Sequence, residues 1–277
     1  MLRDFLRRLA KNRLAVASAV VILLAAVAAI FAPALSPYDP NALDLAAQLS
    51  PPSAAHPLGT DDLGRDVLSR MLYGARISLS VGFVAVGIAI AIGIVLGGIA
   101  GYYGGRLDQF IMWLVDVMLV FPTIFLILAV IAFVGPGLFK IMAIIGLTGW
   151  MGTTRLVRAE FLALREREFV AAVRAQGARD ARIIFRHILP NAVAPVLVSA
   201  TFGVAGAILT ESALSFLGLG VPPPNATWGS LLSDGKAMIE VAWWLTVFPG
   251  LAIFVVSLAY NLLGEGIRDA LDPRLRA

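Results

Sequence analysis

The sequence predicts an all-α integral membrane protein with six transmembrane helices, and composition and patterning both support this fold class. Hydrophobic residues make up 59% of the 277 residues and charged residues 14%, whereas a soluble domain carries about 25% charged residues. Apolar runs of bilayer length, about 20 residues, recur along the chain. The polar segments between them are too short to form a large soluble domain.

Composition also excludes several kinds of site. Cysteine is absent, which rules out disulfides, thiolate metal sites and a cysteine nucleophile. The two histidines, His56 and His187, lie far apart in the sequence, so we expect neither a histidine-based metal site nor a proton relay. The formal net charge of +4 is explained by membrane topology and does not indicate binding to nucleic acid.

The first expected span is Leu14–Ala32, an uninterrupted apolar run. It follows a basic segment, residues 1–13, in which five Lys or Arg residues accompany a single acid, Asp4. The run is longer than the roughly 7–15 residues of a signal-peptide core, although Ala26–Ala28 resembles a cleavage site. We therefore expect an uncleaved membrane helix with its N-terminus in the cytoplasm.

A long, proline-rich loop, Pro33–Arg76, is expected to follow on the outer side. Up to Gly64 it contains four aspartates and no Lys or Arg, an asymmetry typical of an external segment. An apolar stripe within Leu63–Met71 predicts a short interfacial helix, for which Thr60–Asp62 offers an N-cap. We expect the Asp61–Asp62 pair to serve capping and solvation rather than substrate contact.

Five further spans follow from the remaining apolar runs. They are expected at Ile77–Gly101, Leu107–Val134 (broken at Pro122), Phe139–Leu162, Val193–Leu217 and Val241–Leu263. In the second span, Gly93, Gly97 and Gly101 recur every four residues, a pattern that lets helix backbones approach closely. An external loop, Gly218–Glu240, and a polar tail, Gly264–Ala277, complete the chain. We divide the chain into residues 1–76, with the first span and the external loop, and a five-helix core, residues 77–277.

Six spans with both termini in the cytoplasm place residues 102–108, 160–192 and 264–277 on the inner side of the membrane. Most of the arginines lie in these segments or in residues 1–13, in agreement with the excess of positive charge on cytoplasmic loops. The opposite orientation would place the arginine-rich segments outside, so we discount it.

Two acidic residues lie within expected spans, Asp116 in the third and Glu211 toward the outer end of the fifth. An ionisable group at bilayer depth is costly, so each should face protein or a water-filled cavity. Each is a possible lining residue of a translocation path; the alternative for each is a hydrogen bond to a neighbouring helix or a partner subunit. We expect no basic residue at matching depth to pair with them, which argues against a proton-driven transporter.

A charged segment, Arg165–Pro190, separates the fourth and fifth spans. Its first part, Arg165–Gln176, predicts a short helix that Gly177 ends in the left-handed conformation. A second short helix should run from Ala178 until Pro190 stops it. Arginines fall at helical spacing on one face of this second helix and isoleucines on another. Such a helix–turn–helix on a membrane face is typical of a docking surface for another protein.

This segment resembles the cytoplasmic loop of ABC-importer permeases, whose pattern is Glu-Ala-Ala, three residues, Gly, nine residues, Ile, any residue, Leu-Pro. Gly177, Leu189 and Pro190 match the pattern in spacing, and Ala172 takes the first alanine. The chain departs from the family's Glu, Ala and Ile at three positions, Ala171, Val173 and His187.

Three further stretches, His56–Leu79, Glu211–Trp228 and Asn261–Arg274, resemble the dipeptide, oligopeptide and nickel group of these permeases. The resemblance is to the second, or C-type, transmembrane subunit. It implies the MetI-like fold of type I ABC importers, with six transmembrane helices and a cytoplasmic coupling loop at residues 163–192. The residues implied to dock an ATPase are Glu168, Ala171, Ala172, Gly177, Arg179, Asp180, Arg182, His187, Leu189 and Pro190.

The resemblance further implies a heterodimer with a homologous permease, two ATP-binding subunits or domains, and an external solute-binding protein, in a bacterial or archaeal inner membrane. ATP and Mg would be bound by the partners, so we expect no cofactor, no metal and no enzymatic activity in this chain. The nearest approach to a phosphate-binding Walker loop, Gly229–Ala237, has one residue too many between its glycines and ends in alanine. The expected solute is a dipeptide or oligopeptide; alternatives are nickel, glutathione or another small solute, or a secondary transporter, which should show an internal repeat.

Overall fold

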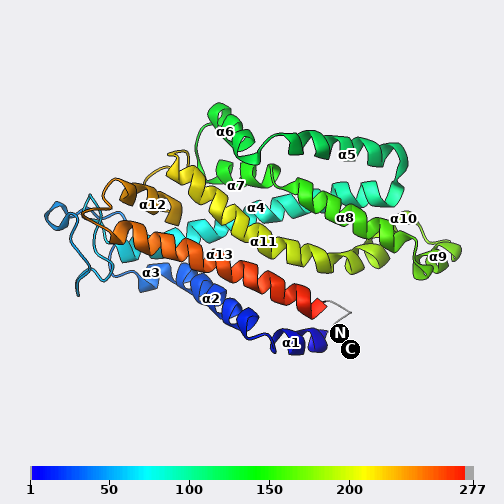
Figure 1. Ribbon diagram of the computed structural model, residues 1–277, viewed down its shortest axis with the longest axis horizontal. Helices are drawn as coiled ribbons and strands as arrows, with labels where there is room; N and C mark the ends of the chain where they lie inside the picture. The colour runs from blue at the N-terminus through cyan, green and yellow to red at the C-terminus, as the bar shows by residue number, and fades with distance from the viewer. Residues whose placement is uncertain (1, 272–277) are drawn as a thin grey trace.

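The structure is a computed structural model that describes residues 2–271, and the regular elements in that range are helical. Figure 1 shows an elongated bundle whose longest helices follow one axis. The helices are α1 (Leu2–Leu9), α2 (Arg13–Ile30), α3 (Ala32–Leu35), α4 (Val67–Tyr103), α5 (Gly105–Val120), α6 (Thr123–Val134), α7 (Leu138–Leu147), α8 (Trp150–Arg165), α9 (Glu168–Ala175), α10 (Asp180–Arg182), α11 (Leu189–Phe216), α12 (Trp228–Lys236) and α13 (Trp244–Leu271). A 3₁₀ turn, Leu45–Ala47, and a π-helical stretch, Ile183–Ile188, complete them.

Four helical stretches in the described part of the chain are long and apolar enough to cross a membrane: α2, α4, α13 and the continuous run Asp180–Phe216. The expected break at Pro122 is confirmed, because α5 and α6 meet there at 86° and form a fifth candidate only if the pair is one span. The expected fourth span is divided into α7 and α8, of 10 and 16 residues. The protein is therefore a multi-pass helical membrane protein with four to five candidate spans, and the expected number of six is not confirmed.

α4 is the central helix, and it packs against α2, α7, α8 and α11. The predicted glycine pattern is confirmed where α4 meets α8. A Cβ at Gly93 would lie 2.6 Å from the Thr153 side chain, and a Cβ at Gly97 would lie 2.5 Å from the carbonyl oxygen of Thr154. Gly101 lies equally close to α8. The two backbones are thus nearer than any larger side chain would allow.

The start of α4 corrects two expectations for the external loop. No separate interfacial helix forms over Leu63–Met71 within the described residues, because α4 itself begins at Val67 and that side chain is buried. The N-cap is Asp66 and not Thr60–Asp62: its carboxylate accepts a hydrogen bond from the backbone N–H of Ser69 at 2.8 Å. The division of the chain at residue 76 therefore falls inside α4.

The second half of the arginine-rich segment also differs from expectation. Gly177 ends α9 with φ +79°, as predicted. Pro190, however, does not stop a helix, since α10, the π-helical stretch and α11 run on continuously. Pro190 lies just after the π-helical stretch, where the altered hydrogen-bond pattern accommodates a proline without a break.

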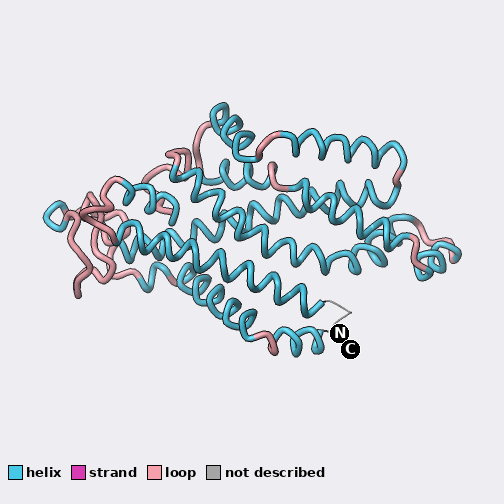
Figure 2. Tube along the Cα trace, in the orientation of Figure 1, coloured by secondary structure: helices cyan, strands magenta, loops and turns pink. Residues whose placement is uncertain are grey.

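The connecting loops gather at one end of the bundle and α9 lies at the other, as Figure 2 shows. The first turns of α1 and the last turns of α13 lie toward the α9 end (Figure 1). The expected external loop Gly218–Glu240 is partly helical, because it contains α12, whose N-terminus is a capping box of Thr227 and Ser230. Trp228 of α12 donates from Nε1 to the carbonyl oxygen of Met71 at 3.1 Å and so holds α12 against α4.

The expected polar tail is largely a continuation of the last helix, because α13 extends to Leu271. Gly264 and Gly266 let α13 approach its neighbours, Gly264 against Phe202 of α11 and Gly266 against Ala15 of α2. Residues 272–277, which include the end of the stretch Asn261–Arg274, lie outside the described residues.

Candidate functional site

The arginine-rich loop, residues 163–192, is anchored to the bundle by its own apolar side chains. Val170, Ile183 and Ile188 are each 0% exposed. They form one hydrophobic cluster with Val157 and Phe161 of α8. Burying three large aliphatic side chains stabilises the loop by about 1.5–3 kcal/mol each. The loop, called the coupling segment below, is therefore a fixed part of the structure.

The opposite face of the coupling segment is open. Large apolar side chains are exposed there, Phe169 at 40% and Phe185 at 69%. Such residues flanked by arginine are enriched at protein interfaces. Of the residues predicted to dock a partner, most are exposed and two, His187 and Leu189, are half-buried; the exposed ones are Glu168, Ala171, Ala172, Gly177, Arg179, Asp180, Arg182 and Pro190.

Polar contacts connect the coupling segment to the end of α4. Tyr102 donates its hydroxyl hydrogen to a carboxylate oxygen of Asp180 at 2.7 Å. Arg165 donates from Nη1 to the carbonyl oxygens of Gly101 and Tyr102, at 3.2 and 3.0 Å. Displacement of the segment would therefore be transmitted to α4. Asp180 was predicted as one of the ATPase-docking residues, and its bond to Tyr102 had no signal in the local sequence.

A groove of about 390 Å³ lies halfway along the bundle, between α4, α6, α7, α8 and α11. Among the described residues, none that lines it is charged. Glycines form part of its wall, and a Cβ at Gly152 or Gly206 would meet no described atom within 4 Å. Its hydroxyl-bearing lining residues come from α6, α8, α11 and the turn between α7 and α8, and they are Thr123, Thr148, Thr153, Ser199 and Thr210. The hydroxyls of Thr148 and Thr210 donate to carbonyl oxygens of neighbouring helical turns and remain able to accept. This lining can exchange hydrogen bonds with a polar solute without selecting for its charge.

The two intramembrane acids lie elsewhere. Asp116 forms an ion pair with Arg155 of α8, so the expectation that no basic residue pairs with it is wrong. Both side chains are more than half exposed. Glu211 is fully buried and accepts a hydrogen bond from Ser215 at 2.7 Å. Neither acid lines the groove, and contact of either with a solute stays a prediction.

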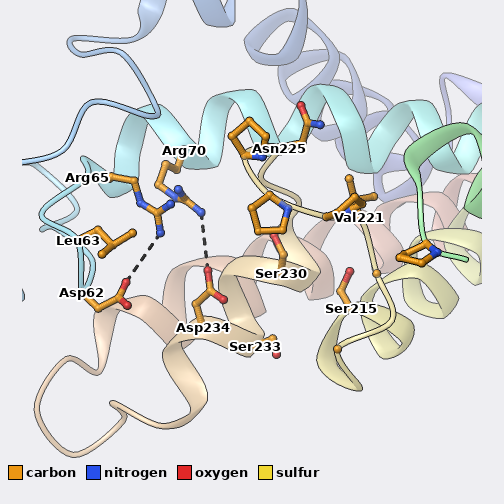
Figure 3. Close-up of a pocket in the computed structure, with 16 residues that line it drawn as sticks. Asp62, Leu63, Arg65, Arg70, Ser215, Val221, Asn225, Ser230, Ser233 and Asp234 are labelled. Carbon is orange, nitrogen blue, oxygen red and sulfur yellow. Dashed lines mark ion pairs between the residues drawn. The ribbon is translucent and has the colours of Figure 1, made fainter.

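A second cavity, of about 430 Å³, lies at the end of the bundle away from α9, between the start of α4, α12 and the loop after α11. Figure 3 shows Arg65 and Arg70 beside each other, with ion pairs to Asp62 and Asp234. Burial raises the pKa of the Asp234 carboxyl, and the nearby Arg70 and Arg65 oppose that rise. Sequence reasoning missed this cluster, although an arginine within the apolar stripe that precedes the second span was a visible anomaly.

Residues 93–277 match the family model described as the binding-protein-dependent transport system inner membrane component. The chain belongs to this permease family. Residues 1–52 match a second model, the N-terminal transmembrane domain of oligopeptide transport permease C. The first match includes the coupling segment and most of the groove, so the sites described above are parts of a transport protein of the inner membrane.

Three relatives resemble this permease over nearly its whole length. The dipeptide transport system permease protein DppC of Alkalihalophilus pseudofirmus is 45% identical, over 99% of this chain and 90% of its own. The oligopeptide transport system permease protein OppC of Bacillus subtilis is 40% identical, over 99% of this chain and 90% of its own. The glutathione transport system permease protein GsiD of Pectobacterium atrosepticum is 42% identical, over 99% of this chain and 92% of its own.

Among solved structures, the permease resembles a chain of the inward-facing MetNI methionine ABC transporter with a TM-score of 0.54 and 19% sequence identity. The likeness covers 72% of this chain and 95% of the other. At this identity it shows the fold alone, and the MetI-like part of the predicted fold class is confirmed.

Proposed function

We propose that this chain is the C-type permease subunit of an ATP-driven ABC importer for dipeptides or oligopeptides. The membrane family to which the chain belongs makes it a transport component. The dipeptide and oligopeptide permeases at 40–45% identity support a peptide as the solute.

The observation that carries the proposal is the neutral groove between α4 and α11. A peptide backbone offers amide donors and carbonyl acceptors, and hydroxyl groups can exchange hydrogen bonds with both. Peptides differ in side-chain charge, so a path that serves many of them should carry no fixed charge of its own. The absence of charge among the described lining residues and the space at Gly206 meet these requirements.

The proposal assigns the inner side of the membrane to the α9 end of the bundle. Most arginines lie in the coupling segment and near the two termini, as the positive-inside bias requires. We infer six crossings, with α5 and α6 together as the third and α7 and α8 together as the fourth. Both termini would then lie in the cytoplasm, and residues 33–66 would face outward.

The groove is open along its side, which suits a path completed by a second, homologous permease. The exposed coupling segment suits docking to one of two ATP-binding subunits or domains, which would hold the ATP and Mg. An external solute-binding protein would deliver the peptide to the outer end. Closure of the ATPases would move the coupling segment, and its bonds to Tyr102 and the close α4–α8 contact would carry that motion to the groove.

The proposal is tested by ATP-dependent uptake of a radiolabelled dipeptide into vesicles that hold the complete transporter. Gly206→Leu, in the groove wall, should reduce uptake at least about tenfold because the side chain fills open space in the path. Gly87→Leu is the matched control, since it lies on α4, outside the groove lining, with no described atom within 4 Å of its Cβ position. Uptake of nickel in place of any peptide, or uptake that needs no ATP, would contradict the proposal.

A further inference from the structure

The outer cavity contains a buried arginine whose hydrogen-bonding capacity is not used. Arg70 is 3% exposed. Its Nε and Nη1 atoms have no hydrogen-bond partner within residues 2–271. The nearest carboxylates, Asp61 at 3.5 Å from Nε and Asp234 at 3.7 Å from Nη2, are beyond the 2.7–3.2 Å typical of such bonds. Leaving a buried charged donor unpaired is costly, and the Arg70 side chain borders the cavity, so this guanidinium favours an acceptor that a small side-chain movement brings within reach.

Both signs of charge face this cavity. Arg65 and Arg70 line it with Asp62 and Asp234, and Asp61, which is buried, pairs with Arg65 at 2.7 Å. The Asp62 and Asp234 side chains are about half exposed, 49% and 50%, whereas Arg70 is deep. Because Asp61 already pairs with Arg65, Arg70 is the positive group left for a ligand, and the half-exposed carboxylates are the negative groups. This arrangement suits a ligand that carries one charge of each sign better than it suits a simple anion.

The remaining walls suit an amide backbone with side chains. Ser233 and Asn225 offer neutral hydrogen-bonding groups, and the prolines Pro222–Pro224 form an apolar side. The volume of about 430 Å³ lies within the range of small-molecule sites, about 300–1,000 Å³.

We propose that this cavity is a binding site for a short zwitterionic peptide at the outer end of the permease. Arg70 takes the α-carboxylate as a charge-assisted acceptor, and Asp234, with Asp62 at the mouth, takes the α-ammonium. The inference deepens the proposed function and rests on it, because the ligand is the solute of the importer. The site would hold the peptide before it enters the neutral groove.

The test is ligand-observed saturation-transfer NMR on the full-length chain in lipid nanodiscs, with the dipeptide Ala-Ala as the probe. Ala-Ala should bind, and the same dipeptide with an acetylated N-terminus and an amidated C-terminus should bind at least about tenfold more weakly, or 1.4 kcal/mol. This comparison needs no variant. Equal binding of the two peptides, or no binding of Ala-Ala up to about 10 mM, would refute the site.

Variants locate the binding. Asp234→Asn changes a half-exposed side chain and should weaken Ala-Ala binding about tenfold while the thermal midpoint stays close to that of the native chain. Glu240→Gln, an exposed acid beyond α12, is the matched control and should bind Ala-Ala normally. Arg70→Gln should abolish binding of Ala-Ala. If that variant does not fold, the Asp234→Asn variant and the dipeptide with acetylated and amidated ends still test the site. Unchanged affinity in Asp234→Asn would overturn the proposal.

ATP-dependent uptake in vesicles separates this inference from the proposed function. A native transporter that imports the dipeptide, in a chain whose cavity binds none, refutes the cavity site alone. A native transporter that imports no peptide refutes the proposed function as well. If Asp234→Asn weakens association of a solute-binding protein but leaves free Ala-Ala binding unchanged, the cavity is a docking surface and the peptide site is wrong.

Discussion

The two ends of the bundle use arginine in opposite ways. At the α9 end, Arg179, Arg182 and Arg186 are exposed, on a segment that apolar side chains anchor from behind. At the opposite end, Arg70 is buried between Asp61 and Asp234. The same residue type thus presents charge to the surroundings at one end and lines a cavity at the other. The two roles differ in how deeply the arginine side chain is buried, which cannot be predicted from the neighbouring residues in the sequence.

A single helix joins the two ends. α4 begins near Arg70 and ends at Tyr102, which bonds to the coupling segment. Between them, its glycine face lies against α8. α4 is therefore a continuous connection between the proposed docking surface and the cavity.

The largest effect is expected in the connection itself. Gly97→Val would place a side chain where a Cβ alone comes within 2.5 Å of a backbone carbonyl oxygen of α8. We expect a loss of about 2–3 kcal/mol in stability, or no folded protein, because backbone cannot move aside as a side chain can. Thermal unfolding and size-exclusion profiles measure this. Gly87→Val, with open space on the same helix, controls for the helix cost of valine; equal losses in the two variants would show that the close contact is unimportant.

The second-largest effect is expected at the proposed docking face of the coupling segment. Reversing Arg179, Arg182 and Arg186 to Glu should reduce ATP-driven uptake more than about tenfold and abolish co-purification of the ATPase, since the charge of the proposed docking face would be inverted. Stability should stay unchanged because these side chains are exposed. Arg106→Glu, at the same end but outside the coupling segment, is the control. Normal co-purification and uptake in the triple variant would remove the docking assignment.

A smaller effect is expected from the bond between the coupling segment and α4. Tyr102→Phe removes the hydroxyl that donates to Asp180 and should cost about 0.5–1.5 kcal/mol of stability. It should also lower the number of peptides imported per ATP hydrolysed by severalfold, with ATPase binding intact. Tyr103→Phe, an exposed neighbour whose ring meets that of Tyr102 edge-on, should change neither quantity. Equal transport stoichiometry in both variants would mean that α4 is not moved through this bond.

The smallest effect is expected at Glu211. It is buried away from the groove, and Glu211→Gln keeps an oxygen that can accept the hydrogen bond from Ser215. Uptake should remain within about twofold of the native value, because a neutral hydrogen bond of similar geometry replaces the original. A loss of uptake as large as that expected for Gly206→Leu would indicate that Glu211 lines the translocation path.

Much of this architecture follows from local sequence, and the exceptions have a common cause. The first span, the glycine face of α4 and the turn at Gly177 were predictable because each rests on residues close together in the chain. The bond between Tyr102 and Asp180 joins residues 78 positions apart, and that between Asp116 and Arg155 joins residues 39 apart. A local sequence pattern cannot predict contacts between residues so far apart in the chain.

Helix boundaries were predicted less well for a different reason. An apolar run indicates the length of a segment that can lie in the bilayer. Capping and packing determine the residue at which the helix begins. α4 begins ten residues before the expected Ile77 because Asp66 caps it and the first turn is buried. Pro190 was expected to end a helix, and the π-helical stretch before it allows the helix to continue.

The central claim is that the arginine-bearing coupling segment and the outer cavity lie on opposite sides of the membrane. The chain contains no cysteine, so Arg182→Cys and Asp62→Cys each introduce a single labelling site. A membrane-impermeant maleimide applied to intact cells should label the cysteine at 62 and leave the cysteine at 182 unlabelled until the membrane is permeabilised. Labelling at 182 in sealed cells would contradict the account.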